Sequence, residues 1–209
     1  MNTGHETGNI WNFFSDSCFL FTSSVQSAPV SSPAFQETAT RAKTLVEKIL
    51  KNVPAAHSAT VSIQGLSLES STQSSNLQMM EVSLGIPASP VLKKLSDHFT
   101  LEMCVSRMLA GVQMYQNLLG VLSTSLSGLE DLRADLRDLL THINKLKEAA
   151  QLQVDGSDQN QDLDLASHLQ DSYSSQVAVH LTLTQLRSFC HDLIRTFRVL
   201  TSYRAAGTR

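Results

Sequence analysis

Two pairs of ionisable residues have a spacing that could support chemistry. Asp138 and His142 are four residues apart, so a helix would place both side chains on one face. There they could form an ion pair or share a metal ion. His191 and Asp192 are adjacent in the chain. A metal site needs further ligands, and a lone acid–histidine pair is usually solvated. We therefore interpret both pairs as surface features.

Sequence motifs of the common catalytic classes are missing from the chain. It has no Gly-rich phosphate loop, no Gly-x-Ser-x-Gly elbow and no Glu-x-x-His motif of the kind found in di-iron bundles. Ser and His residues are numerous, but no spacing singles out a nucleophile and its base. We therefore expect a protein that is not an enzyme and that uses neither a cofactor nor a metal ion.

The cysteines allow two interpretations. Cys18, Cys104 and Cys190 form no Cys-x-x-Cys motif and no cluster at zinc spacing. Cys104 and Cys190 both fall in apolar segments with a helical pattern. The simpler interpretation is a pair of buried free thiols. The alternative is one disulfide between two helices, which requires an oxidising compartment.

Length and charge limit the possible classes of protein. The chain has 209 residues, enough for one domain with a sizeable core. Its formal net charge is −3, which gives no reason to expect nucleic acid or an anionic membrane as a partner. The sequence contains no run of eighteen apolar residues that would predict membrane insertion.

Residues 1–27 differ in character from the rest. Small residues at Val25-Gln26-Ser27 precede Ala28, as at a signal peptidase site, and Phe19 lies in a short apolar run. No Lys or Arg precedes that run, and Asp16 interrupts the segment. The segment is either an atypical signal peptide or a disordered N-terminal segment, and residues 28–209 form the main domain.

Four segments carry apolar residues at spacings that alternate between three and four, as on one buried face of a helix. We expect helices over residues 33–53, 90–123, 128–150 and 172–204. Ser32 and Pro33 are typical of a helix start, and Pro54 is expected to end the first helix. The expected core positions are Phe35, Ala39, Ala42, Val46, Ile49, Val53, Leu101, Val105, Met108, Val112, Tyr115, Leu119, Leu122, Leu129, Leu132, Leu136, Leu139, Ile143, Leu146, Val179, Leu183, Leu186, Cys190, Leu193, Phe197 and Leu200.

The lengths of the links restrict the topology. A helix of about twenty residues spans about 30 Å, so a link between parallel helices needs at least about ten extended residues. Residues 55–82 and 151–171 can return along the bundle, whereas the break near 123–128 cannot. The sequence therefore predicts an all-α fold, an up-up-down-down long-chain four-helix bundle with two long crossover links.

These apolar stripes, which we call seams, also suit other classes of protein. An amphipathic lipid-surface protein is one alternative, but the apolar stripes are narrow and the polar faces are not especially basic. An intracellular helical-bundle interaction protein is another, and the pattern does not distinguish it.

Particular motifs resemble a known family. Ser-Leu-Gly-Ile-Pro at 83–87, followed by Cys104, Gly111 and Tyr-Gln-Asn-Leu-Leu at 115–119, is similar to the granulocyte colony-stimulating factor family, a branch of the interleukin-6 superfamily. The chain looks like a distant, fish-like member, and the resemblance covers roughly residues 33–204. It implies a secreted cytokine or growth factor of the extracellular space, monomeric when free.

The resemblance also implies a partner and a receptor surface. The partner would be a class I cytokine receptor, like the granulocyte colony-stimulating factor receptor, which the cytokine dimerises to stimulate granulocyte proliferation and differentiation in the immune response. By position, the main receptor-binding residues would be Asp135 and Asp138, with Glu47 on the first helix. From the residues alone, Asp135 and Asp138 suit a solvated face with Arg137 and Lys145 as partners.

The chain departs from the family pattern in three respects: its second receptor surface, its disulfides and its atypical N-terminal segment. A second receptor surface in the family uses a Glu in the first link, where this chain has Asn76, with Glu69 and Glu81 as possible replacements. Cys104 matches one half of a family disulfide, but its partner position is Lys94. The first link contains no cysteine.

Overall fold

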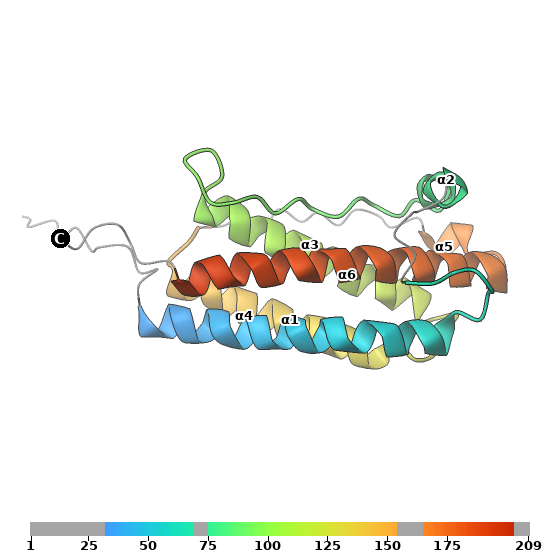
Figure 1. Ribbon diagram of the computed structural model, residues 1–209, viewed down its shortest axis with the longest axis horizontal. Helices are drawn as coiled ribbons and strands as arrows, with labels where there is room; N and C mark the ends of the chain where they lie inside the picture. The colour runs from blue at the N-terminus through green and yellow to red at the C-terminus, as the bar shows by residue number, and fades with distance from the viewer. Residues whose placement is uncertain (1–31, 69–74, 154–164, 203–209) are drawn as a thin grey trace, which may run out of the picture.

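The computed structural model describes residues 32–68, 75–153 and 165–202, and over these residues it is helical without a strand. The predicted all-α class is confirmed. Four long helices form the body, and two short ones lie in the links (Figure 1). In chain order the helices are α1 (Pro33–Thr60), α2 (Ser75–Ser83), α3 (Leu101–Leu122), α4 (Glu130–Ala149), α5 (Leu165–His168) and α6 (Ser172–Ser202).

The long helices pack side by side as a bundle. α1 packs against α6 and α4, and α3 packs against the same two helices. α1 and α3 therefore lie diagonally across the bundle, so α1 has two flanks, one facing α4 and one facing α6 (Figure 1). No helix among the described residues is both long and apolar enough to cross a membrane.

The apolar seams form the core. All the expected core positions are buried except Leu101, which is partly exposed at the start of α3. α6 is buried over a wider face than one seam, because α1, α2 and α3 all contact it. Its additional buried apolar residues are Val177, Ala178, Leu181, Phe189 and Ile194.

Two helix boundaries differ from those expected. α1 continues through Pro54 and ends at Thr60. A proline removes one backbone donor and strains the preceding turn, but Ala56, His57 and Thr60 are buried beyond it. Burial of these residues outweighs the local cost, because tertiary packing supplies most of the stability of a helix in a protein.

α3 begins at Leu101 and not near residue 90. Thr100 caps it, accepting a hydrogen bond from the Met103 N–H at 3.2 Å. Before it, Ser96 and Phe99 exchange two backbone hydrogen bonds of 3.0 Å, and Phe99 is buried under the Arg107 guanidinium. The seam begins at Leu101, so a helix that started earlier would bury no further seam residue. α4 and α6 lie within the expected ranges.

The segment from α2 to α3 runs along the outside of the long helices (Figure 1). Leu84 and Ile86 anchor it in the core. Gly85 between them has φ +67, a conformation that side chains with a Cβ rarely adopt. The Ser-Leu-Gly-Ile-Pro motif is therefore a turn whose two apolar residues fix the segment to the bundle.

Candidate functional site

Asp135 forms an ion pair between two helices. It lies on α4 and is buried, and the Lys48 Nζ of α1 donates a hydrogen bond of 2.6 Å to its Oδ1. The Asn52 amide donates to Oδ2 at 3.5 Å. The Asp135 side chain is 7% exposed, whereas that of Lys48 is 59% exposed. Solvent therefore reaches the cation and not the carboxylate.

Lys48 lies among three carboxylates of α4. The hydrogen bond that Lys48 donates to Asp135 is the largest cause that raises the pKa of Lys48, followed by the charge of Asp135. Burial lowers the pKa of Lys48, and the charges of Asp131 and Asp138 raise it by smaller amounts. Asp131 and Asp138 are both exposed. We call this set of Lys48, Asn52, Asp131, Asp135 and Asp138 the α1/α4 face.

The expectation of an exposed carboxylate is wrong for Asp135. Its partner is Lys48 of the neighbouring helix and neither Arg137 nor Lys145. The carboxylate precedes the core residue Leu136, so it sits at the edge of the seam, where the next helix covers it. The place of Asp135 next to a seam residue could have indicated its burial, and sequence reasoning missed this signal.

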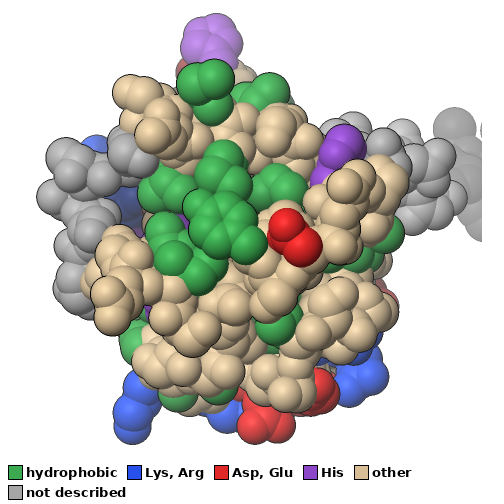
Figure 2. All heavy atoms as spheres, turned by 90° about the vertical axis from the view of Figure 1, so that its right-hand side faces the viewer, with side chains coloured by type: hydrophobic (Ala, Val, Ile, Leu, Met, Phe, Trp, Pro, Cys, Tyr) green, Lys and Arg blue, Asp and Glu red, His purple; other side chains and the backbone are tan. Residues whose placement is uncertain are grey.

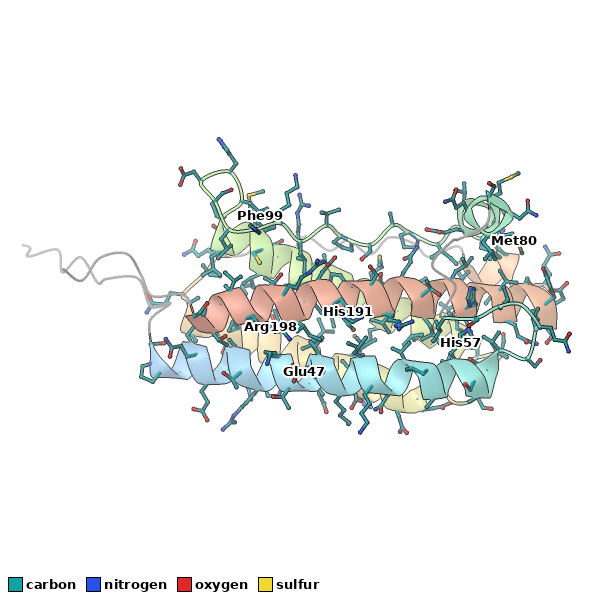
Figure 3. All side chains as sticks on the ribbon, in the orientation of Figure 1. Glu47, His57, Met80, Phe99, His191 and Arg198 are labelled. Atoms are coloured by element: carbon teal, nitrogen blue, oxygen red, sulfur yellow. The ribbon has the colours of Figure 1, made fainter. Side chains whose placement is uncertain are left out.

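Glu47 lies apart from the α4 carboxylates. Its side chain pairs with Lys43 on its own helix, with Nζ and Oε1 3.1 Å apart. Successive residues of a helix point about 100° apart, and its neighbour Lys48 is the one that faces α4. In Figure 3, Glu47 lies on the side of α1 that faces the viewer. His191 and Arg198 lie on the same side of the molecule, on α6. The structure therefore brings together Asp135 and Asp138 but not Glu47.

The second expected surface is on and around α2. Asn76 is exposed on α2, and Glu81 accepts a hydrogen bond of 2.6 Å from the Gln185 amide of α6. Glu69 lies outside the described residues. Met79 and Val82 of α2 are 71% and 81% exposed.

Cys104 and Cys190 are buried free thiols, so the disulfide alternative is wrong for this structure. Burial raises the pKa of Cys104 to about 11 and that of Cys190 to about 12. The Phe189 ring lies level with Gly111 and Tyr115 of α3.

The acid–histidine pairs are at the surface. Asp192 forms an ion pair with Arg195 on its own helix. Asp138 is exposed and His142 is partly exposed. Among residues 32–68, 75–153 and 165–202, no group of three potential metal ligands lies together.

One pair of ionisable residues was missed by sequence reasoning. His57 of α1 and His180 of α6 are buried, with His57 Nε2 3.0 Å from His180 Nδ1. His57 continues the spacing of Val53, and His180 follows the seam residue Val179. The signal was visible, but the expected end of the helix at Pro54 excluded His57 from the core.

One end of the bundle carries a gathering of apolar side chains. Figure 2 views the end where α1 finishes and α6 begins, and hydrophobic side chains occupy the middle of that face. Tyr173, in the first turn of α6, is 55% exposed.

No family model matches this chain, and no curated protein matches it.

Proposed function

We propose that this chain is a secreted haematopoietic cytokine resembling granulocyte colony-stimulating factor. It binds and dimerises a class I cytokine receptor and stimulates granulocyte proliferation and differentiation from outside the cell. It acts by binding and not by catalysis. The observation that carries the proposal is the pair of motifs at 83–87 and 115–119 within an all-helical bundle.

Both motifs have a structural task in the bundle, which supports their use as markers of the family. In the first, Leu84 and Ile86 are buried. In the second, Tyr115, Leu118 and Leu119 are fully buried in α3. A shared pattern of buried residues favours a shared fold, whereas function must come from an exposed site.

The topology that we propose is up-up-down-down with two long crossover links. The colours of α1 and α3 both progress from left to right in Figure 1, and those of α4 and α6 progress from right to left, which supports it. The chain between α3 and α4 is short, and the other two connections are long. Only long connections can join consecutive helices that run parallel.

The main receptor contact that we propose is the α1/α4 face. Asp131 and Asp138 are exposed there and can accept charge-assisted hydrogen bonds from receptor arginines. Lys48 neutralises Asp135 and holds α1 against α4. Asp135 therefore positions the face, and Asp138 makes contact.

The test adds purified residues 28–209, at nanomolar concentration, to matched cells with and without the granulocyte colony-stimulating factor receptor of the same species. Phosphorylation of the receptor-linked signalling factor is the readout. A response only in receptor-bearing cells is expected. A folded, helical and monomeric chain that gives no response contradicts the proposal. A response through a sister receptor would identify another interleukin-6-type cytokine, and retention in the cytosol on expression would favour an intracellular interaction protein.

A further inference from the structure

The His57–His180 pair joins the last turn of α1 to the first half of α6. The two rings are 5.3 Å apart between centroids and meet edge to face. The Nε2 to Nδ1 distance of 3.0 Å allows one hydrogen bond, in which one nitrogen donates and the other accepts. Figure 3 shows His57 near the right-hand end, where α1 and α6 face each other.

That hydrogen bond limits how many protons the pair can hold. Two neutral rings share one proton between the facing nitrogens, and a single extra proton on an outer nitrogen still permits the bond. A second extra proton would place two N–H groups against each other at 3.0 Å and bury two like charges. The closed arrangement is therefore compatible with at most one added proton, whereas separated rings bind two.

Among residues 32–68, 75–153 and 165–202, no carboxylate raises the pKa of either imidazole. Ionisable groups on the neighbouring elements include Glu81 of α2, which accepts from Gln185, Arg187 of α6, which donates to the Leu68 carbonyl, and Glu130 of α4, which accepts from the Gly128 N–H. His168 ends α5, just before α6 begins. None of these groups shifts the pKa of His57 or of His180. Burial lowers the pKa of His57 and of His180, and the charge of His57 lowers that of His180 further.

Two further contacts of this part of the fold do not titrate near neutral pH. The Ser62 N–H and hydroxyl donate to the Gln176 Oε1 at 2.8 and 3.0 Å, and the Arg187 guanidinium donates to the Leu68 carbonyl at 2.7 Å. Arginine keeps its charge at all accessible pH values. Acid therefore weakens the histidine contact and leaves these contacts in place.

We propose that the His57–His180 pair is an acid-sensitive latch, which holds the end of α1 to α6 at neutral pH and releases it at the pH of acidic compartments, about 5 to 6. When the contact between the two histidines breaks, this end of the bundle loosens while the remainder stays folded. It does not depend on the receptor proposal, because it follows from the buried pair alone.

The direction of the effect follows from proton binding. Above about 6.5, the usual value for histidine, both rings are neutral whether the end is closed or open. Below it, the open form takes up protons that the closed form excludes. The opening constant therefore rises as the pH falls, with a limiting slope of tenfold per pH unit if the closed pair holds one added proton and a hundredfold if it holds none.

The test is amide hydrogen exchange of the full chain at pH 7, 6 and 5, with each rate divided by its intrinsic rate. Amides at 57–62 and 176–184 are expected to lose protection as the pH falls, while amides in the middle of α4 do not. The variant His180→Gln, which removes one of the two protonation sites, should have a smaller slope than the wild-type chain. The matched control His191→Gln, at an exposed histidine of the same helix, should retain the wild-type slope.

Two results would overturn the latch. One is a wild-type slope that persists in a folded His57→Gln/His180→Gln double variant, and the other is an equal loss of protection in α4. If the double variant does not fold, NMR titration of the wild-type imidazoles decides the matter. Midpoints of His57 and His180 below 6.5 support the latch, and midpoints at or above 6.5 contradict it.

Discussion

Whether a carboxylate of α4 is available to a partner depends on the residue opposite it on α1. Asp135 and Asp138 are three residues apart on the same helix, yet one is buried against Lys48 and the other is exposed. Residues at this spacing share a helix face, so sequence reasoning treated the two alike. The neighbouring helix, which the sequence does not display, separates their roles.

Asp138→Lys is expected to weaken receptor binding by about tenfold to a hundredfold. The change removes a charge-assisted acceptor, worth about 1.5–3 kcal/mol, and adds a like charge opposite receptor arginines. Affinity is measured on immobilised receptor, with helicity checked by circular dichroism. Glu148→Lys, an exposed charge reversal further along α4, is the control and should bind normally. Equal affinities for the two variants would remove Asp138 from the contact.

Lys48→Ala is expected to lower the midpoint of urea unfolding more than Lys51→Ala does. The first change leaves Asp135 buried without its cation, whereas Lys51 is an exposed lysine of the same helix. Because the pKa of Lys48 is raised from 10.5, its contribution is present throughout the neutral range and is lost only as the pH rises through its folded value. Indistinguishable midpoints at pH 7 would show that the pair adds nothing to stability.

At the scale of the helices, α3 and α6 approach each other closely at Gly111, which has no side chain. A Cβ built at Gly111 would lie 2.3 Å from the Cζ of Phe189, so the aromatic ring occupies the space that glycine leaves. The Tyr115 ring lies against the same phenylalanine, with centroids 5.4 Å apart. This glycine weakens the helix locally but permits the packing of its neighbour.

Gly111→Ala is therefore expected to destabilise the fold by roughly 1–2 kcal/mol, because overpacking exceeds the gain in helix propensity. Gly120→Ala is the matched control on the same helix. Its Cβ would meet only the flexible Arg133 side chain at 3.5 Å, so a gain of up to about 1 kcal/mol is expected. Thermal and urea unfolding measure both variants. Opposite signs support the packing argument, and a stabilising Gly111→Ala contradicts it.

The helices were predictable where the apolar spacing continued and unpredictable where a local signal competed with it. The seams of all four long helices are buried as expected, because a 3.6-residue period specifies a helix face directly. Pro54 is a strong local stop signal, yet packing carries α1 past it. The start of α3 was placed too early, because Pro90 resembles a first helical residue while the seam begins at Leu101.

At the scale of the whole molecule, α2 is attached to the bundle less firmly than the long helices are to one another. α2 has no buried residue, and its described contact with the body is with α6, including the Glu81–Gln185 hydrogen bond. Leu84 and Ile86 provide the nearest anchor in the core. Local stability follows the amount of buried apolar contact.

Amides of α2 are therefore expected to exchange at least about a hundredfold faster than those in the middle of α6 at pH 7. Native-state hydrogen exchange read by mass spectrometry measures the difference. Peptides covering α4, a long helix of the bundle, provide the internal reference. Protection of α2 equal to that of α6 would contradict this view of the link.

Less of the candidate site than of the fold could be predicted from the sequence. Composition and spacing place acids on α4, but they do not show which of them α1 covers. The buried histidines were missed because their helices meet only in three dimensions, at residues 57 and 180. Pairings between distant segments depend on the arrangement of the bundle, whereas each seam depends on one segment.

The two flanks of α1 have a consequence for engineering. Lys48 faces α4 and Glu47 lies on the side shared with α6, although the two residues are neighbours in the chain. The residues on the two flanks of α1 can therefore be substituted independently of each other. If each flank holds a different receptor chain, charge reversals on one flank would give a molecule that occupies one chain without recruiting the second. Such a variant would be a competitive antagonist built on an unchanged scaffold.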